Sequence, residues 1–292
     1  MAKPVKPDSR VLVAFTLVVL FLGVNFVAVR FSNQELPPFW GATLRFAIAS
    51  AVLFVVVGVR RVPLPKDGAF TGAVLLGATA FGGNFALIYW GLLHVTSATA
   101  AIIFATVPAM TFLMAAGAKL EKFRWGALLG AAVALVGIAF IFAEQLGSSY
   151  PLGSLVAIFL GAALAAASGV IVKKFPRGHP VSINAVGMSV GTAILFVVSL
   201  VSGEHQAYPV MARTWIALGW LVTSSVVAFV LLVWVIYHWT ASASSYTSLL
   251  SPLVTFVVAS AIAGESISLV FLAGSAVVLV GVYLGAIRRG RT

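Results

Sequence analysis

Uncharged polar residues lie within stretches of the chain that are otherwise strongly apolar, and six of them are candidates for binding a ligand. Amide and hydroxyl groups donate and accept hydrogen bonds without carrying a net charge. In a membrane such groups are costly unless they face the protein interior or a cavity. We therefore expect them to bind a neutral or zwitterionic small molecule, with Phe81 adding an aromatic surface for an apolar side chain. The six residues are Asn25, Asn84, Ser168, Ser244, Tyr246 and Ser251.

The same residues also have a purely structural interpretation. An asparagine or serine in an apolar helix can bond across a helix–helix contact, and Phe81 and Tyr246 can pack in the core or against lipid. Other aromatic residues, such as Tyr89 and Trp234, lie near the predicted helix ends, where an interfacial belt explains them. Cavity lining and packing both stay open at this point.

No acidic residue is expected near the middle of the membrane. All seven acids fall in predicted joints, three on one side and four on the other. A carrier of lipophilic cations, or one driven by protons through a buried carboxylate, needs such a group, so the sequence argues against both. The acids are Asp8, Asp67 and Glu121 on one side and Glu35, Glu144, Glu204 and Glu265 on the other.

One basic residue, Arg45, falls inside an apolar run, about two helical turns from its end. Snorkelling of the long side chain to the membrane interface explains such a position. Binding of a carboxylate is the alternative.

The sequence contains no recognisable catalytic or metal-binding constellation. The absence of cysteine excludes disulfides and zinc–thiolate sites. The four histidines fall in joints on opposite sides of the membrane, without a histidine–acid cluster or a glycine-rich phosphate loop. We expect no enzymatic activity, no cofactor and no metal ion.

Long apolar runs must position the polar residues. The 292-residue chain is 61% hydrophobic and 9% charged, with a mean hydropathy of +1.11, which lies outside the balance of a soluble domain. Because about 20 apolar residues span the hydrocarbon core, these runs predict an all-α integral membrane protein with ten transmembrane helices. The expected spans are residues 11–31, 38–58, 68–92, 96–117, 123–143, 151–173, 180–202, 213–236, 241–263 and 266–287.

The basic residues that give the chain its net charge of +11 are distributed in a way that indicates its orientation in the membrane. With the N-terminus in the cytoplasm, 15 of the 18 lysines and arginines fall in cytoplasmic segments, as the positive-inside rule requires. We expect a multi-pass protein of the bacterial inner membrane with both termini in the cytoplasm. Its expected partners are the lipid bilayer and a small-molecule substrate, with no nucleic acid and no required oligomer.

The chain contains an internal repeat at a constant offset of 144 residues. Residues 94–137 align without a gap on residues 238–281, with 14 of 44 positions identical, and Pro108 aligns with Pro252. A proline inside a helix removes one hydrogen bond and crowds the carbonyl four residues earlier. The pair therefore predicts hinges or kinks in the fourth and ninth helices, whose freed carbonyls either contact the substrate or only let the helices bend.

The repeat divides the chain into two halves, residues 1–146 and 147–292, of five expected helices each. Because five is odd, the second half should be inverted in the membrane relative to the first. Inverted repeats recur in secondary transporters, which bind substrate near the midplane where the halves meet. Glycines at 126, 130, 274 and 281 also predict close backbone approach in the fifth and tenth helices.

Two aligned segments carry a family resemblance: TSATAAIIFATVPAMTFLMAAGAKLEK, from residue 96, and ASASSYTSLLSPLVTFVVASAIAGESIS, from residue 241. Small residues, a mid-helix proline and a glutamate at the following loop resemble the EamA domain of the drug/metabolite transporter superfamily, over essentially the whole chain. The chain looks most similar to the bacterial aromatic amino acid exporters of the YddG type. The resemblance implies a ten-helix fold with a central cavity between helices 1, 3, 4, 6, 8 and 9, and with helices 5 and 10 at the periphery.

We therefore expect a secondary transporter that exports small amino acids or related metabolites, aromatic or apolar ones, by alternating access. The alternatives are an exporter of other neutral metabolites or drugs, a channel-like facilitator, and a membrane scaffold that transports nothing. A channel should show a polar stripe along its helices, whereas the polar positions of this chain are scattered.

Overall fold

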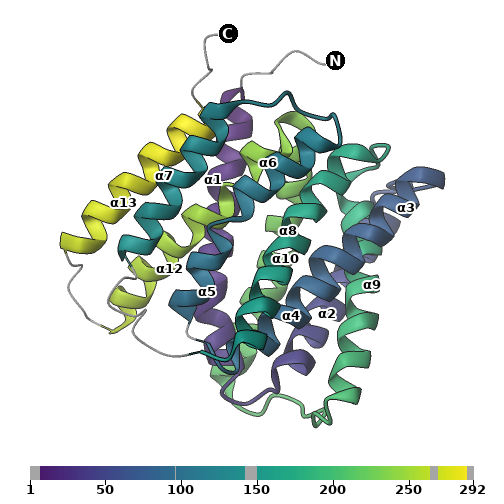
Figure 1. The fold of residues 1–292 in the computed structure, drawn as a ribbon. Coiled ribbons are helices and arrows are strands. Elements are labelled where there is room, and N and C mark those ends of the chain that lie inside the picture. Colours follow the sequence, from purple (N-terminus) through teal and green to yellow (C-terminus); the bar gives the residue numbers. More distant parts are fainter. Residues whose placement is uncertain (1–6, 96, 142–149, 264–268, 288–292) are drawn as a thin grey trace.

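The computed structural model describes residues 7–95, 97–141, 150–263 and 269–287, and the regular structure in these ranges is helical (Figure 1). The expectations for Glu144 and Glu265, and for the basic residues before residue 7 and after residue 287, lie outside these ranges. The first part of the chain forms α1 (Ser9–Ser32), α2 (Pro38–Val59), α3 (Asp67–Leu76), η1 (Gly77–Gly83), α4 (Asn84–Leu92), α5 (Ser97–Phe104), α6 (Val107–Gly117) and α7 (Trp125–Ile141). The second part forms α8 (Leu152–Lys174), α9 (Pro180–Val201), α10 (Ala212–His238), α11 (Ala241–Ser244), α12 (Thr247–Ala263), α13 (Leu269–Val282) and η3 (Tyr283–Ile287).

Eight helices in the described ranges are long and apolar enough to cross a membrane. One of them, Asp67–Leu92, joins α3, η1 and α4, and another, Ala241–Val258, joins α11 to most of α12. Two further apolar helices, Ile102–Gly117 and Trp125–Ile141, are shorter and fall within the expected fourth and fifth spans. The chain is a multi-pass membrane protein.

Local sequence signals explain where several helices begin. α2 and α9 each start with a proline, Pro38 and Pro180, at a position where the helix does not use an N–H group. α1 starts after Asp8, whose carboxylate accepts a hydrogen bond from the N–H of Val11 at 2.8 Å. These signals lie at the boundaries between loops and helices, so they also define where the apolar helices begin.

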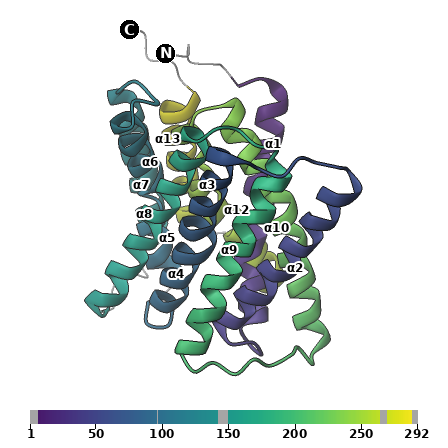
Figure 2. The same ribbon diagram turned by 90° about the vertical axis from the view of Figure 1, so that its right-hand side faces the viewer.

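The main helix–helix contacts join the first part of the chain to the second. α1 packs on α10 and α12, while α8 packs on α4, η1 and α6. α2 packs along α9, which also runs beside α3 (Figure 2). α7 and α13 lie side by side at one edge of the molecule (Figure 1). If each expected span is equivalent to the span five places later, then α1 is equivalent to α8, and the contacts of α1 with α10 and α12 correspond to those of α8 with α4 and α6. The pairs α2–α9 and α7–α13 each join two equivalent spans.

Glycines allow α7 to approach α13 and the following η3 closely. A Cβ atom added to Gly130 would lie 2.3 Å from the backbone nitrogen of Gly285, and one added to Gly281 would lie 2.4 Å from that of Ala134. A Cβ atom added to Gly126 would meet no atom within 4 Å. The predicted close approach is therefore confirmed at Gly130 and Gly281 and is wrong at Gly126, which lies on the open side of α7.

Three of the apolar segments are interrupted. The π-helical segment η1 separates α3 from α4, a turn at residues 105–106 separates α5 from α6, and a turn at residues 245–246 separates α11 from α12. Pro108 lies in the first turn of α6, where its missing N–H costs little, whereas Pro252 lies inside α12. The two prolines therefore occupy different places relative to the interruptions, although they align in the sequence.

Acidic side chains link the two parts at one end of the bundle. The Glu35 carboxylate, after α1, accepts a hydrogen bond from the N–H of Met211 at 3.2 Å, directly before α10. The Glu204 carboxylate, after α9, accepts one from the N–H of Trp40 at 2.8 Å, in the first turn of α2. Both contacts satisfy N–H groups that a helix start leaves without an intrahelical partner.

The other end of the bundle carries the start of α1 and the end of α13 (Figure 1), and we call it the terminal end. Here the Glu121 carboxylate accepts a hydrogen bond from the N–H of Ser242 in α11 at 3.0 Å. Lys173 donates from Nζ to the carbonyl of Ile236 at 2.8 Å, and Arg177 donates to that of Tyr237 at 2.9 Å. Charged groups thus cap the helix ends on this side as well.

Candidate functional site

Two adjacent serines of α10 form buried hydrogen bonds to two different helices. The Ser224 hydroxyl donates to Oδ1 of Asn25 in α1 at 2.5 Å. The Ser225 hydroxyl accepts from Nε of Arg45 in α2 at 2.6 Å and donates to the carbonyl of Leu221 at 2.7 Å. All four side chains are buried, Asn25 with 6% and Arg45 with 2% of its surface exposed. We call Asn25, Arg45, Ser224 and Ser225 the polar layer.

Arg45 points into the bundle. Its guanidinium carbon lies 5.0 Å from the ring centroid of Phe46 and 5.5 Å from that of Phe85, within the range of cation–π attraction. The snorkelling expected for Arg45 is wrong, because the side chain turns toward α10 and the aromatic rings. A charge inside a membrane protein is costly, and it marks a functional site by default.

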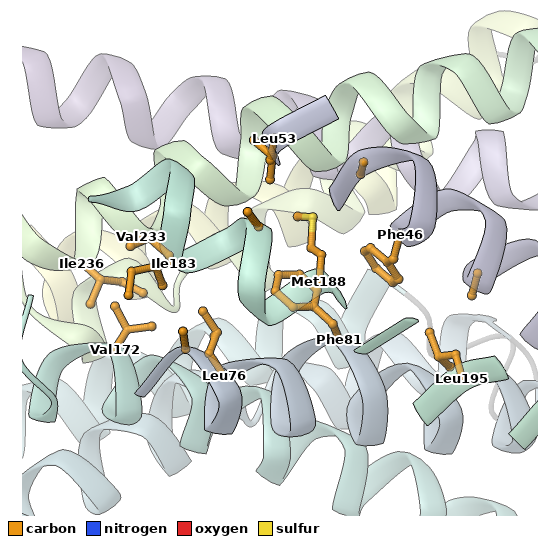
Figure 3. Close-up of a cluster of buried hydrophobic side chains, with 14 of the residues drawn as sticks. Phe46, Leu53, Leu76, Phe81, Val172, Ile183, Met188, Leu195, Val233 and Ile236 are labelled. Atoms are coloured by element: carbon orange, nitrogen blue, oxygen red, sulfur yellow. The ribbon is translucent and has the colours of Figure 1, made fainter. Parts of the chain in front are cut away.

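Aromatic rings from four elements gather next to the polar layer. Phe46 of α2, Phe81 of η1, Phe85 of α4 and Phe229 of α10 make ring contacts with centroid separations from 4.9 to 6.4 Å. Phe46 and Phe81 each expose at most 1% of their surface, and Figure 3 shows them beside Met188. These four rings, which we call the phenylalanine cluster, pack against one another in the interior of the bundle through edge-on and tilted ring contacts.

The π-helical segment η1 positions Phe81. Its glycines allow α9 to approach, since a Cβ atom at Gly77 would lie 2.4 Å from the carbonyl oxygen of Gly187 and one at Gly82 would lie 2.7 Å from Ile194. The wider turn of a π-helix shifts the following residues around the helix axis, and such segments occur often at functional sites. Phe81 thereby meets Phe46 and Phe229.

The structure places Asn84 apart from Asn25. The Asn84 amide nitrogen donates to the carbonyl of Ala80 at 3.3 Å. Its Oδ1 atom is buried without a hydrogen-bond partner in the described contacts, and it lies 3.6 Å from the position of a Cβ atom added to Gly161 of α8. Asn84 thus belongs to the α4–α8 contact, whereas Asn25 belongs to the equivalent contact between α1 and α10.

The three other expected serines bond within their own helices. The hydroxyl of Ser168 donates to the carbonyl of Ala165 at 2.7 Å, and those of Ser244 and Ser251 donate to the carbonyls four residues earlier at 2.8 Å. Helical serines commonly satisfy their hydroxyls in this way. These bonds leave Ser168, Ser244 and Ser251 outside the polar layer.

Tyr246 extends away from the polar layer toward α7 and η3. Its hydroxyl donates to the carbonyl of Ala127 at 3.3 Å. A Cβ atom added to Gly285 would collide with the same hydroxyl, so the glycine makes room for the tyrosine. The side chain is 2% exposed. This placement favours a packing role for Tyr246 over the expected place in a cavity.

A cavity of about 540 Å³ opens at the terminal end. It lies between the first turns of α1, the start of α9 and the last turns of α10, with Arg10, His179 and Trp234 among its lining residues. None of the residues expected to bind substrate lines this cavity. Nor does the described part of the chain group three histidine or acidic side chains in a way that could hold a metal ion.

Comparison with known protein families identifies the chain. The EamA-like transporter family matches residues 9–143 and, a second time, residues 152–286. The chain belongs to the EamA-like transporter family. This is a family of transporters and not of enzymes, and its two matches correspond to the two parts of the chain that the internal repeat relates.

Two relatives of this EamA protein cover nearly its whole length. It is 25% identical over 278 residues to a probable terminal-alkyne amino-acid exporter of Streptantibioticus cattleyicolor, covering 94% of this chain and 93% of the relative. It is 26% identical over 281 residues to a probable amino-acid metabolite efflux pump of Salmonella typhimurium, covering 92% of each. A solved crystal structure superposes with a TM-score of 0.81 at 17% identity, over 95% of this chain and 96% of the other, which shows a shared fold.

Four residues of the site are not predicted from the sequence: Phe46, Ser224, Ser225 and Phe229. They lie in apolar runs without a motif, and the serine pair in the middle of one run is the signal that the sequence offers. The sequence marks Arg45 as a charge inside an apolar run, but it does not show which way the side chain turns. Only the packing of α2 against α9 and α10 decides that direction.

Proposed function

We propose that this EamA protein exports small amino acids with aromatic or apolar side chains across the bacterial inner membrane, by alternating access. Two of its full-length relatives carry names of amino-acid export and amino-acid metabolite efflux. A zwitterionic amino acid offers an ammonium and a carboxylate at one end and an apolar group at the other. The substrate site must therefore combine polar groups with an apolar surface.

The observation that carries this proposal is the contact between the polar layer and the phenylalanine cluster. Arg45 belongs to the first and lies over Phe46 and Phe85 of the second. The side chains come from α1, α2, η1, α4 and α10, which belong to both parts of the chain. A site shared by the parts can change its exposure when they move relative to each other.

We infer that the two halves, residues 1–146 and 147–292, are inverted repeats forming ten membrane spans. The paired packing of α1 with α10 and of α8 with α4 supports this, because inverted copies should make equivalent contacts. The terminal end would face the cytoplasm, since Arg60, Lys119 and Lys174 lie at or directly after helix ends on that side. Both termini would then be cytoplasmic.

We place the substrate against Asn25 and Phe81 of the expected residues, together with Arg45 and Phe85. Asn84 would line the same path from the α8 side, where its free carbonyl oxygen could accept a hydrogen bond from an ammonium group. The hydroxyls of Ser168, Ser244 and Ser251 are engaged within their helices. Pro252, inside α12, remains the better hinge candidate of the two prolines.

Transport by purified protein in liposomes tests the proposal. The vesicles would be loaded in turn with labelled phenylalanine, tryptophan, alanine or a quaternary amine, with and without a pH gradient. We expect phenylalanine and tryptophan to leave fastest, in a saturable manner, and the quaternary amine to stay inside, because the described interior offers it no carboxylate.

Equal release of all four compounds would indicate a channel-like facilitator. Release of none of the amino acids, by protein that is monodisperse before reconstitution, would contradict amino-acid export and favour another metabolite. Protein-free vesicles provide the baseline for passive leakage.

A further inference from the structure

We propose that the guanidinium of Arg45 binds the carboxylate group of the transported molecule. This inference rests on the proposed function in one respect, namely that the transported molecule is an amino acid. It adds a chemical requirement, because a compound that keeps its apolar group but loses its carboxylate should no longer bind well.

The first argument is the charge that surrounds Arg45. Its partners in the described contacts are the Ser225 hydroxyl, two aromatic rings and, through an electrostatic interaction, the buried phenol of Tyr89. A hydroxyl dipole and ring faces attract a cation, but they do not neutralise it. A buried ion without a counter-ion is unfavourable, so an arriving carboxylate would find an uncompensated positive charge.

No acid of the described ranges lies where it could serve as this counter-ion. Arg45 lies seven residues into α2, about 10 Å along the axis from its start, and none of these acids makes an ion pair with it. Each of them lies in a loop or at a helix end. They are Asp8, Glu35, Asp67, Glu121 and Glu204.

The second argument is the geometry of the guanidinium. In the described contacts only Nε donates a hydrogen bond, to Ser225. The two terminal nitrogens of an arginine form a planar fork that matches the two oxygens of a carboxylate. Ser225 thus fixes the orientation of the group and leaves the fork for a ligand.

The third argument is the apolar surface beside the charge. Phe46 and Phe85 lie under the guanidinium, and Phe81 and Phe229 extend the same cluster. A ligand with its carboxylate on Arg45 would place an apolar or aromatic side chain against these rings. The arrangement thus matches both ends of an amino acid with an aromatic side chain.

A structural role for Arg45 is the competing explanation, and the second half of the chain argues against it. α2 and α9 are both 22 residues long and both begin with proline, so Arg45 corresponds to Gly187. A Cβ atom at Gly187 would lie 3.3 Å from the carbonyl oxygen of Ala73, in a close helix contact. The equivalent helix therefore folds without an arginine at this position.

The test compares two ligands that differ only in their end group, a charged carboxylate or a neutral carboxamide. Thermal unfolding of the purified, full-length protein would be followed with increasing 3-phenylpropionate or 3-phenylpropionamide. We expect the acid to bind about 10- to 100-fold more tightly than the amide, the ratio typical of a hydrogen bond to a charged group. Equal apparent affinity of the two compounds for the wild-type protein would overturn the proposal, and this comparison needs no variant.

Substitutions then assign the preference to Arg45. Arg45→Gln should lose the preference for the acid while keeping the affinity for the amide, and Arg45→Lys should retain part of it. Arg60→Gln removes one exposed positive charge at the end of the same helix and should behave like the wild type. A preference for the acid that persists in Arg45→Gln would contradict the proposal.

The two proposals fail in different ways. If the wild type prefers the acid through Arg45 but transports no amino acid, the result supports the carboxylate site and contradicts amino-acid export. If phenylalanine is transported and Arg45→Gln transports it equally well with unchanged KM, the result supports export and contradicts the carboxylate site.

Discussion

Ser224 and Ser225 have different partners although they are neighbours in α10. Ser224 bonds to the neutral amide of Asn25, whereas Ser225 bonds to the charged group of Arg45. Residues one position apart on a helix point in directions about 100° apart, so the pair reaches α1 and α2 at the same depth. The polar layer therefore depends on a serine pair rather than on a single residue.

Ser224→Ala removes the partner of a buried amide oxygen. We expect the substitution to lower the free energy of unfolding by about 1 kcal/mol, between the values typical of membrane helix contacts and of an unsatisfied buried acceptor. Thr223→Ala is the matched control, because Thr223 is exposed and its hydroxyl donates, among the described contacts, to the carbonyl of Gly219 in its own helix. Equal stability of the two variants, measured by denaturation in mixed micelles, would argue against a stabilising role for this bond.

Glu35 links the pH dependence of stability to the start of α10. The Thr214 hydroxyl and the N–H groups of Val210 and Met211 hold the pKa of this carboxyl below its ordinary value of 4.5. Since the lowered pKa belongs to the folded state, the contribution is complete above pH 4.5 and is lost as the pH falls through the folded-state value.

The Glu35→Gln variant should therefore be less stable than the wild type at pH 7, and the difference should shrink once the pH falls below 4.5. The measurement is the thermal midpoint of both proteins between neutral and acidic pH. A difference that stays constant over the whole range would show that ionisation of Glu35 does not contribute.

At the scale of elements, the interruptions and close contacts of the described helices distinguish this bundle from a set of straight, uninterrupted helices. The sequence predicts the apolar segments within a few residues, because the length and hydropathy of a span are local properties. It does not predict η1 or the different settings of Pro108 and Pro252, since these depend on which helix packs against the segment. For the same reason it misplaced Arg45.

Gly130→Ala should destabilise the contact of α7 with α13 and η3. The added methyl group would overlap backbone atoms of Gly285, which cannot rotate away as a side chain can. We expect a loss of about 1–3 kcal/mol, typical of overpacking. Gly126→Ala, four residues earlier, meets nothing and should be neutral or slightly stabilising, because alanine has the higher helix propensity. Equal effects of the two substitutions would contradict the observed contact.

The two prolines should respond differently to replacement by alanine. Pro252→Ala can restore a hydrogen bond inside α12, so we expect a more stable protein with a transport rate several-fold lower, if this helix must bend. Pro108→Ala lies in the first turn of α6 and should change both quantities little. Transport of labelled phenylalanine and thermal midpoints would be measured together, and an unchanged rate in Pro252→Ala would remove the hinge.

At the scale of the whole molecule, the proposed function depends on how the two halves meet. The sequence repeat predicts two copies, and the family match covers both of them. The repeat does not indicate where the copies differ, and the polar layer lies at such a difference, since Arg45 corresponds to Gly187. We therefore expect the fold to be nearly symmetric and the substrate site to be asymmetric.

Counterflow tests the central claim most directly. Liposomes containing the protein would be filled with unlabelled phenylalanine and diluted into a trace of labelled phenylalanine. Alternating access predicts that the label accumulates transiently inside the liposomes above its equilibrium level. Sites that open to the lumen release the label and then bind the abundant unlabelled substrate, so little label is carried back out. The overshoot should disappear in Arg45→Gln and persist in Arg60→Gln. Entry of the label to equilibrium without an overshoot would contradict the account and indicate a passive channel.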